Sequence, residues 1–250
     1  MRNIWTIAKR EYRHYFITPI AYVVTILILF VIGIVFVNDI GNLTVNAMQA
    51  YGSTPTIAPI TGVFTFMLML TAPAITMRLI SDETRTGTLE LLLTSPVRIY
   101  ELVVGKRLGA LLFVMAVLAL TLVYPLILNG LVDPGIDQQV MMAAYLGTIL
   151  AAAAFLGLGT GISAVFSNQI AALLVTFLVF FSLWWLVGIP TQIIQSSGGL
   201  AVFRYLEMPS HFYDSFNMGT LRLADVVYFV SLAALGLFIG TTAVEVRRWR

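Results

Sequence analysis

The clearest pattern along the chain is a series of long stretches without charged side chains, separated by short charged segments. A membrane-spanning helix needs about 20 predominantly apolar residues. Four uncharged stretches suit one span each, whereas residues 138–203 suit two spans, divided by the polar triplet Ser167, Asn168 and Gln169. The pattern predicts an all-α membrane protein with six transmembrane helices, at about residues 20–37, 60–80, 106–128, 141–166, 170–189 and 225–244.

Two segments outside the spans have patterns of their own. Residues 1–18 place apolar side chains such as Trp5 on one arc of a helical wheel and basic ones such as Arg10 and Arg13 on the other. This pattern indicates an interfacial amphipathic helix, and a basic tail that only sets orientation is the alternative. The outer segment 190–224 mixes aromatic residues with few charges, and we expect short helices there, partly in the outer leaflet, as a lid above a dimer.

The loop at residues 81–98, between the second and third spans, predicts a short coupling helix. Gly87 can end one helix and Thr88 can cap the next. Leu89 and Leu92 then share a face at helical spacing. Such a helix suits docking onto a partner protein, although it could also rest on lipid headgroups.

Composition and charge agree with a membrane protein and orient it. Hydrophobic residues make up 59% of the chain and charged residues 10%, against roughly 45–50% and 25% in soluble domains. Because cytoplasmic flanks carry the basic excess, we expect both termini in the cytoplasm of a cell with this chain in its inner (plasma) membrane. Most lysines and arginines fall on that side in the six-span arrangement, namely Arg2, Lys9, Arg10, Arg13, Arg78, Arg85, Arg98, Lys106, Arg107, Arg247, Arg248 and Arg250.

Several functional classes are disfavoured by the residues present. The chain has no cysteine, which excludes thiol catalysis, and its net charge of +2 is too small to indicate nucleic-acid binding. Ser163 could be a hydrolase nucleophile, but it needs a nearby base, and His14 and His211 are predicted on opposite membrane faces. With Gly157 and Gly161, Ser163 is better interpreted as part of a small-residue packing face. The run Ala151 to Ala154 continues this face and could pack within one protomer or across a dimer.

One motif runs through the loop after the second span: Glu83-x-Arg85-x-Gly87-Thr88-Leu89-Glu90-x-Leu92-x-Thr94-x-Pro96, with Gly105-Lys106 following. It resembles the signature of ABC-2-type transporter permeases. A second motif, His211-Phe212-x-x-Ser215-Phe216-x-x-Gly219, resembles the branch that contains gliding-motility permeases and the permease of nitrous-oxide-reductase maturation.

The resemblance implies a permease subunit of an ATP-driven exporter, driven by a separate ABC ATPase subunit and paired with a second copy or a paralogue. ATP and Mg would be bound by the ATPase and no cofactor by this chain. This agrees with the lack of a Walker-type phosphate loop, since Gly105-Lys106 is followed by Arg107. The residues implied at the ATPase interface are Glu83, Arg85, Gly87, Thr88, Leu89, Glu90, Leu92, Thr94 and Asn168.

Two alternatives to an exporter remain open at this point. The chain could be a mechanical transducer that passes ATP-driven motion to a periplasmic accessory protein. It could also be an ion-coupled secondary carrier, although such carriers normally need ionisable groups inside the membrane, and the predicted spans have essentially none. An enzymatic activity of its own is not expected.

Overall fold

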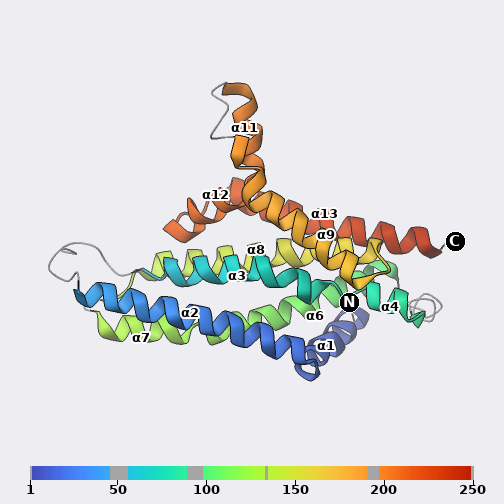
Figure 1. Cartoon of the computed structure of the whole chain (residues 1–250), viewed down its shortest axis with the longest axis horizontal. Coiled ribbons are helices and arrows are strands. Elements are labelled where there is room, and N and C mark those ends of the chain that lie inside the picture. The colour runs from blue at the N-terminus through green and yellow to red at the C-terminus, as the bar shows by residue number, and fades with distance from the viewer. Residues whose placement is uncertain (1, 46–55, 89–97, 133–134, 191–196, 249–250) are drawn as a thin grey trace.

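The computed structural model describes residues 2–45, 56–88, 98–132, 135–190 and 197–248, and within them every regular element is helical (Figure 1). The elements are α1 (Arg2–Ile17), α2 (Pro19–Val45), α3 (Ala58–Thr76), α4 (Ser81–Arg85), α6 (Ile99–Leu120), α7 (Val123–Leu131), α8 (Gln138–Val165), α9 (Gln169–Phe181), η1 (Ser182–Leu186), α11 (Ser197–Leu206), α12 (Met208–Tyr213), η2 (Phe216–Met218) and α13 (Leu223–Arg248).

Within these ranges, six helices are long and apolar enough to cross a membrane, which confirms the predicted number of spans. They are Pro19–Asn42, Ala58–Arg85, Ile99–Leu131, Gln138–Val165, Gln169–Leu186 and Leu223–Arg247. Most of them run side by side along the long axis of the molecule, whereas α11 projects sideways (Figure 1). We call the end that holds α1, α4 and the last turn of α13 the basic end.

The third span consists of two helices, α6 and α7, because a proline interrupts it. In a continuous helix, the ring of Pro125 would clash with the carbonyl oxygen of Thr121, four residues earlier. The backbone turns there, and the Thr121 hydroxyl donates to the carbonyl of Leu118 at 2.6 Å. The same hydroxyl lies 3.1 Å from the Tyr145 hydroxyl of α8, so the break is held against the fourth span.

The small-residue face of α8 packs against α13 of the same protomer. A Cβ atom at Gly157 would lie 2.8 Å from the carbonyl oxygen of Ala233, and one at Gly161 would lie 2.4 Å from that of Gly236. Such distances leave no room for a side chain, so the two backbones are in direct contact. Gly157 and Gly161 therefore pack within the protomer.

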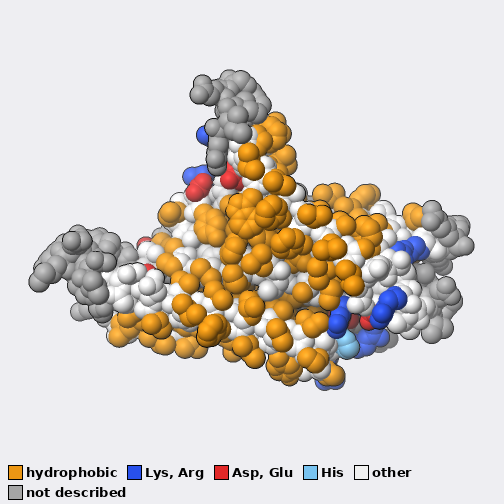
Figure 2. All heavy atoms as spheres, viewed as in Figure 1, with side chains coloured by type: hydrophobic (Ala, Val, Ile, Leu, Met, Phe, Trp, Pro, Cys, Tyr) orange, Lys and Arg blue, Asp and Glu red, His pale blue; other side chains and the backbone are white. Residues whose placement is uncertain are grey.

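Apolar side chains cover much of the face of the bundle that the space-filling view shows (Figure 2). Phe30 of α2, Leu126 of α7, Leu178 of α9 and Phe238 of α13 are each at least 60% exposed. In water such a surface would drive association. In a bilayer it contacts lipid, and the helices satisfy their own backbone hydrogen bonds.

At the end opposite the basic end, η2 is fastened to the start of α3. The Asn217 side chain donates to the carbonyl of Ala58 at 3.1 Å and accepts from the Thr61 hydroxyl at 2.7 Å. Phe216 is fully buried over Gly147 of α8. The expected short outer helices thus include elements packed into the bundle, while their position in the outer leaflet stays a prediction.

A buried histidine joins the outer helices to the last span. His211 Nδ1 lies 2.6 Å from the Asp225 carboxylate, and Nε2 lies 2.9 Å from the carbonyl oxygen of Tyr205. The ring stacks on Tyr228 with 4.0 Å between centroids. Since a carbonyl oxygen can only accept, Nε2 carries a hydrogen and donates it to Tyr205.

Candidate functional site

The predicted coupling loop begins with α4, which a serine from another span holds in place. After α3 the chain turns, and the backbone N–H groups of Ile80 and Ser81 both donate to the Ser163 hydroxyl at 3.2 Å. Ser163 itself donates to the carbonyl of Met77 at 3.2 Å. A helix start leaves N–H groups unsatisfied, and here a side chain of α8 satisfies two of them. Ser163 is therefore a structural support for α4.

The short helix α4 also has favourable charges at both of its ends. Asp82 and Glu83 lie in its first turn and Arg85 in its last, which complements the helix dipole. Gly87 then adopts φ +72°, the left-handed conformation that ends many helices. The structure agrees with the predicted helix end at this glycine.

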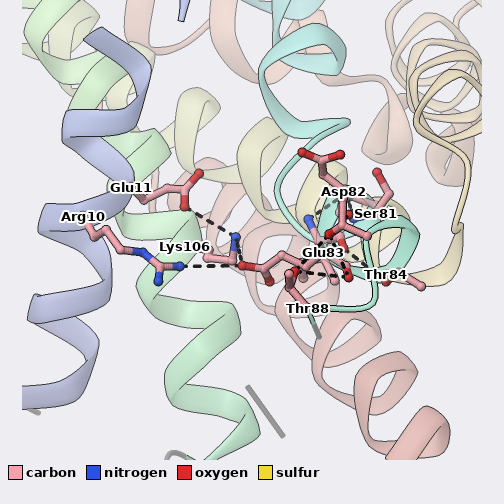
Figure 3. Close-up of polar contacts among 11 residues, drawn as sticks. Arg10, Glu11, Ser81, Asp82, Glu83, Thr84, Thr88 and Lys106 are labelled. Atoms are coloured by element: carbon pink, nitrogen blue, oxygen red, sulfur yellow. Dashed lines mark hydrogen bonds and ion pairs between the residues drawn. The ribbon is translucent and has the colours of Figure 1, made fainter. Parts of the chain in front are cut away.

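A group of four charged side chains, of which Arg10 is exposed and the other three are largely buried, links α4 to two other helices. We call Arg10, Glu11, Glu83 and Lys106 the charge cluster (Figure 3). The Lys106 ammonium lies 2.9 Å from the Glu83 carboxylate and 3.4 Å from that of Glu11, and Arg10 lies 3.7 Å from Glu83. The Lys106 side chain is only 4% exposed. Two cations therefore neutralise two carboxylates. The cations come from α1 and α6, and the carboxylates come from α1 and α4.

The close approach of α1 to α6 explains how Lys106 reaches Glu11. A Cβ atom at Gly105 would lie 2.8 Å from the Cβ of Ile7, and one at Gly109 would lie 2.5 Å from the Cβ of Glu11. Only hydrogen atoms fit at these two positions of α6. The glycines four residues apart therefore form a flat strip on which α1 rests.

The polar triplet between the fourth and fifth spans lies beside α4. Asn168 accepts a hydrogen bond from the backbone N–H of Ile170 at 2.9 Å and so caps α9. The neighbouring Gln169 donates its side-chain amide to Asp82 of α4. The two segments that the resemblance implies at an ATPase interface are thus adjacent, although they are far apart in the sequence.

The individual residues implied at that interface lie in different surroundings. Arg85, Gly87, Thr88 and Asn168 are exposed. Glu83 is only 14% exposed because its carboxylate faces Lys106 and Arg10 within the charge cluster. The remaining predicted positions lie outside the described residues, namely Leu89, Glu90, Leu92 and Thr94.

Sequence reasoning missed the partners of Glu83 and the role of Ser163. One signal was present: on a helical wheel Glu11 falls beside the apolar residues Ile4 and Ile7 of the first helix, and Lys106 follows a glycine inside an apolar stretch. A charge in such a place needs a partner. The pairing itself joins residues 95 positions apart and so depends on the fold.

Tyr15 adds an uncharged contact beside the cluster. Its hydroxyl donates to the carbonyl of Ile75, at the end of α3, at 3.2 Å. Burial, and then the negative charge of Glu11, raises the pKa of this hydroxyl well above its usual range. Tyr15 therefore stays protonated and holds α1 to α3.

As for metals, the described residues contain no group of three or more His, Asp or Glu side chains arranged to hold an ion.

Comparison with known proteins bears on most of this architecture. Residues 5–197 match the model of a family described as ABC-2 family transporter protein. The match covers more than half of the chain and includes the charge cluster, α4 and the capped start of α9. No curated protein sequence matches the chain.

Proposed function

The chain belongs to the ABC-2 family of transporter proteins, and on that premise we propose that it is the permease subunit of an ATP-driven exporter. As a family member with six apolar helices, it is a multi-pass membrane permease of an ABC transporter, and an ABC ATPase is its implied partner. The finer statements of the proposal are the outward direction, coupling to the ATPase through α4, and pairing with a second permease copy or a paralogue.

The observation that carries the coupling proposal is the linkage of α4 to the rest of the basic end. The charge cluster ties α4 to α1 and α6, and Ser163 with Gln169 ties it to α8 and α9. A push on the exposed part of this loop would therefore reach four other helices. Packed interiors transmit displacement because they compress little.

We place the ATPase contact on the exposed residues of the two adjacent loops, with Arg85, Gly87, Thr88 and Asn168 as its described members. Glu83 acts differently in this proposal, since its carboxylate is engaged inside the protein. It passes on movement from the contact to α1 and α6. ATP and Mg belong to the ATPase.

The test is recovery of the ATPase with tagged permease from native membranes, followed by mass spectrometry and an ATPase assay. Arg85→Glu, which reverses an exposed charge within the proposed contact, should reduce ATPase recovery while leaving the permease folded. The matched control is Arg222→Glu, an exposed charge reversal at the other end of the bundle. Equal recovery with both variants would refute the placement of the contact.

The same experiment separates the exporter from its alternatives. A permease recovered alone, under conditions that preserve other ABC complexes, would favour an ion-coupled carrier. An ATPase that co-purifies without any transport in vesicles, together with a periplasmic accessory protein, would favour a mechanical transducer. Reporter fusions at the two termini and after residue 222 would test the proposed orientation, with both termini in the cytoplasm of the inner membrane.

A further inference from the structure

A cleft of about 950 Å³ opens at the basic end, between α1, the start of α2, the end of α3, α4 and α6. The space-filling view shows lysine and arginine side chains gathered at this end, directly beside the apolar surface of the bundle (Figure 2). The cleft thus has a basic side and an apolar side. Neither the six-span architecture nor the proposed ATPase contact accounts for it.

The basic side of the cleft carries positive charge that the residues described by the structure do not neutralise. Five lysine or arginine side chains line it against three carboxylates, and the carboxylates already face cations of the charge cluster and of α4. Lys9, Arg13 and Arg78 are exposed and form no ion pair with any other residue that the structure describes. These three side chains are free to bind an anion.

The apolar side of the cleft continues onto the surface where lipid chains lie. Ile17 and Ile20 come from the junction of α1 and α2, and Ala74 and Ile75 come from the end of α3. Ile17 is 77% exposed, and Trp5, which also lines the cleft, is 60% exposed. Tryptophan favours the headgroup level of a bilayer. The cleft therefore has a basic side next to an apolar side, and Trp5 indicates that both lie near the headgroup level of the bilayer.

We propose that this cleft binds an anionic glycerophospholipid, with its phosphate between Arg13 and Arg78 and an acyl chain along Ile17, Ile20 and Ile75. Arginine suits phosphate because its planar guanidinium can donate two parallel hydrogen bonds. A free phosphate would satisfy the arginines but would leave the apolar wall unused. The bound lipid would contact α1, α2 and α3 together, and so would stabilise the part of the fold that holds the charge cluster.

The test uses Trp5 as a reporter, because brominated acyl chains quench a tryptophan that they touch. Delipidated protein in detergent is titrated with brominated phosphatidylglycerol or brominated phosphatidylcholine. The chain has four tryptophans, so the fluorescence quenching due to lipid in the cleft is taken as the quenching of the unaltered chain minus that of Trp5→Phe. Phosphatidylglycerol should quench at lower concentration than phosphatidylcholine. Arg13→Gln and Arg78→Gln should each weaken its binding about fivefold, the effect of one basic side chain near an anionic lipid.

Two controls keep this test decisive. Arg222→Gln removes an exposed arginine at the other end of the bundle and should leave the quenching unchanged. Arg13→Lys keeps the charge but loses the two parallel hydrogen bonds, so it should weaken binding less than Arg13→Gln does. Equal quenching by the two lipids, or no effect of Arg13→Gln and Arg78→Gln, would overturn the proposal. Release of the lipid by inorganic phosphate, but not by chloride at the same ionic strength, would also overturn it, in favour of a soluble phosphate compound.

Discussion

Replacement of Lys106 by methionine tests whether the charge cluster holds α1, α4 and α6 together. Methionine is similar in length to lysine, so the change removes the charge without leaving a large cavity. The side chains of Glu11 and Glu83 are 11% and 14% exposed. Without Lys106, Arg10 would be the one cation of the charge cluster left to compensate their two negative charges. Removing one member of a buried ion pair costs about 3–5 kcal/mol.

The size of this effect can be converted into a thermal shift. In proteins of 150–250 residues, 1 kcal/mol corresponds to about 2–4 °C in Tm. Lys106→Met should therefore lower the apparent Tm in a fixed detergent by roughly 6–20 °C. The assay is the loss of the monodisperse peak of fluorescently tagged protein after heating. The control is Arg85→Met, because its ion pair with Asp82 is exposed and such pairs contribute about 0–1 kcal/mol.

A double variant separates the cluster from a general effect of losing a lysine. Glu83→Gln removes one of the two carboxylates that face Lys106. Combined with Lys106→Met, it leaves fewer uncompensated charges, so the double variant should be more stable than the sum of the single losses, by about 0.5–3 kcal/mol. Additive losses, or a loss for Lys106→Met no larger than for Arg85→Met, would refute the idea that these charges support one another.

Three further predictions concern the same end of the bundle. Gly109→Ala should push α1 away from α6. A cysteine introduced by Ile7→Cys into this cysteine-free chain should then react faster with a maleimide than it does when Gly109 is unaltered. Unchanged reactivity would contradict the close approach of the two helices. Ser163→Ala leaves two N–H groups without their acceptor and should cost about 1–3 kcal/mol, measured by Tm against Ser182→Ala, which removes only a hydrogen bond within its own helix. Because the pKa of Tyr15 is raised in the folded protein, the stability contributed by its hydroxyl is present below the usual tyrosine pKa of about 10 and is lost as pH rises above that value. The Tm of the unaltered protein should therefore fall more steeply between neutral and strongly alkaline pH than the Tm of Tyr15→Phe. Parallel curves would exclude a contribution of the Tyr15 hydroxyl to stability.

The number and type of the spans could be predicted from the sequence because lipid imposes a simple rule. A span must be long, apolar and internally hydrogen-bonded, so uncharged stretches mark it directly. The hairpin at Asn168 was also visible, since a polar triplet interrupts an otherwise apolar run. The helix end at Gly87 follows from a local property, the ease with which glycine adopts positive φ.

The supports of the candidate site could not be predicted in the same way because they depend on packing between distant segments. Glu83 has the same sequence neighbours whether its carboxylate faces water or Lys106. Its inward orientation requires α1 to rest on the glycines of α6, which places Arg10 and Glu11 beside it. Likewise, the sequence suggests a packing role for Ser163 but not that its hydroxyl accepts from the start of α4.

The contact between α8 and α13 has a consequence for how the protein is made. Gly157 and Gly161 leave the ribosome long before Ala233 and Gly236, the residues against which they pack. Until α13 is inserted, the bare backbone at these two glycines of α8 lacks the helix that packs against it in the folded protein. The bundle can close only after α13 has been made and inserted, so a nonsense mutation near residue 223 would leave the glycine strip of α8 without the helix that covers it.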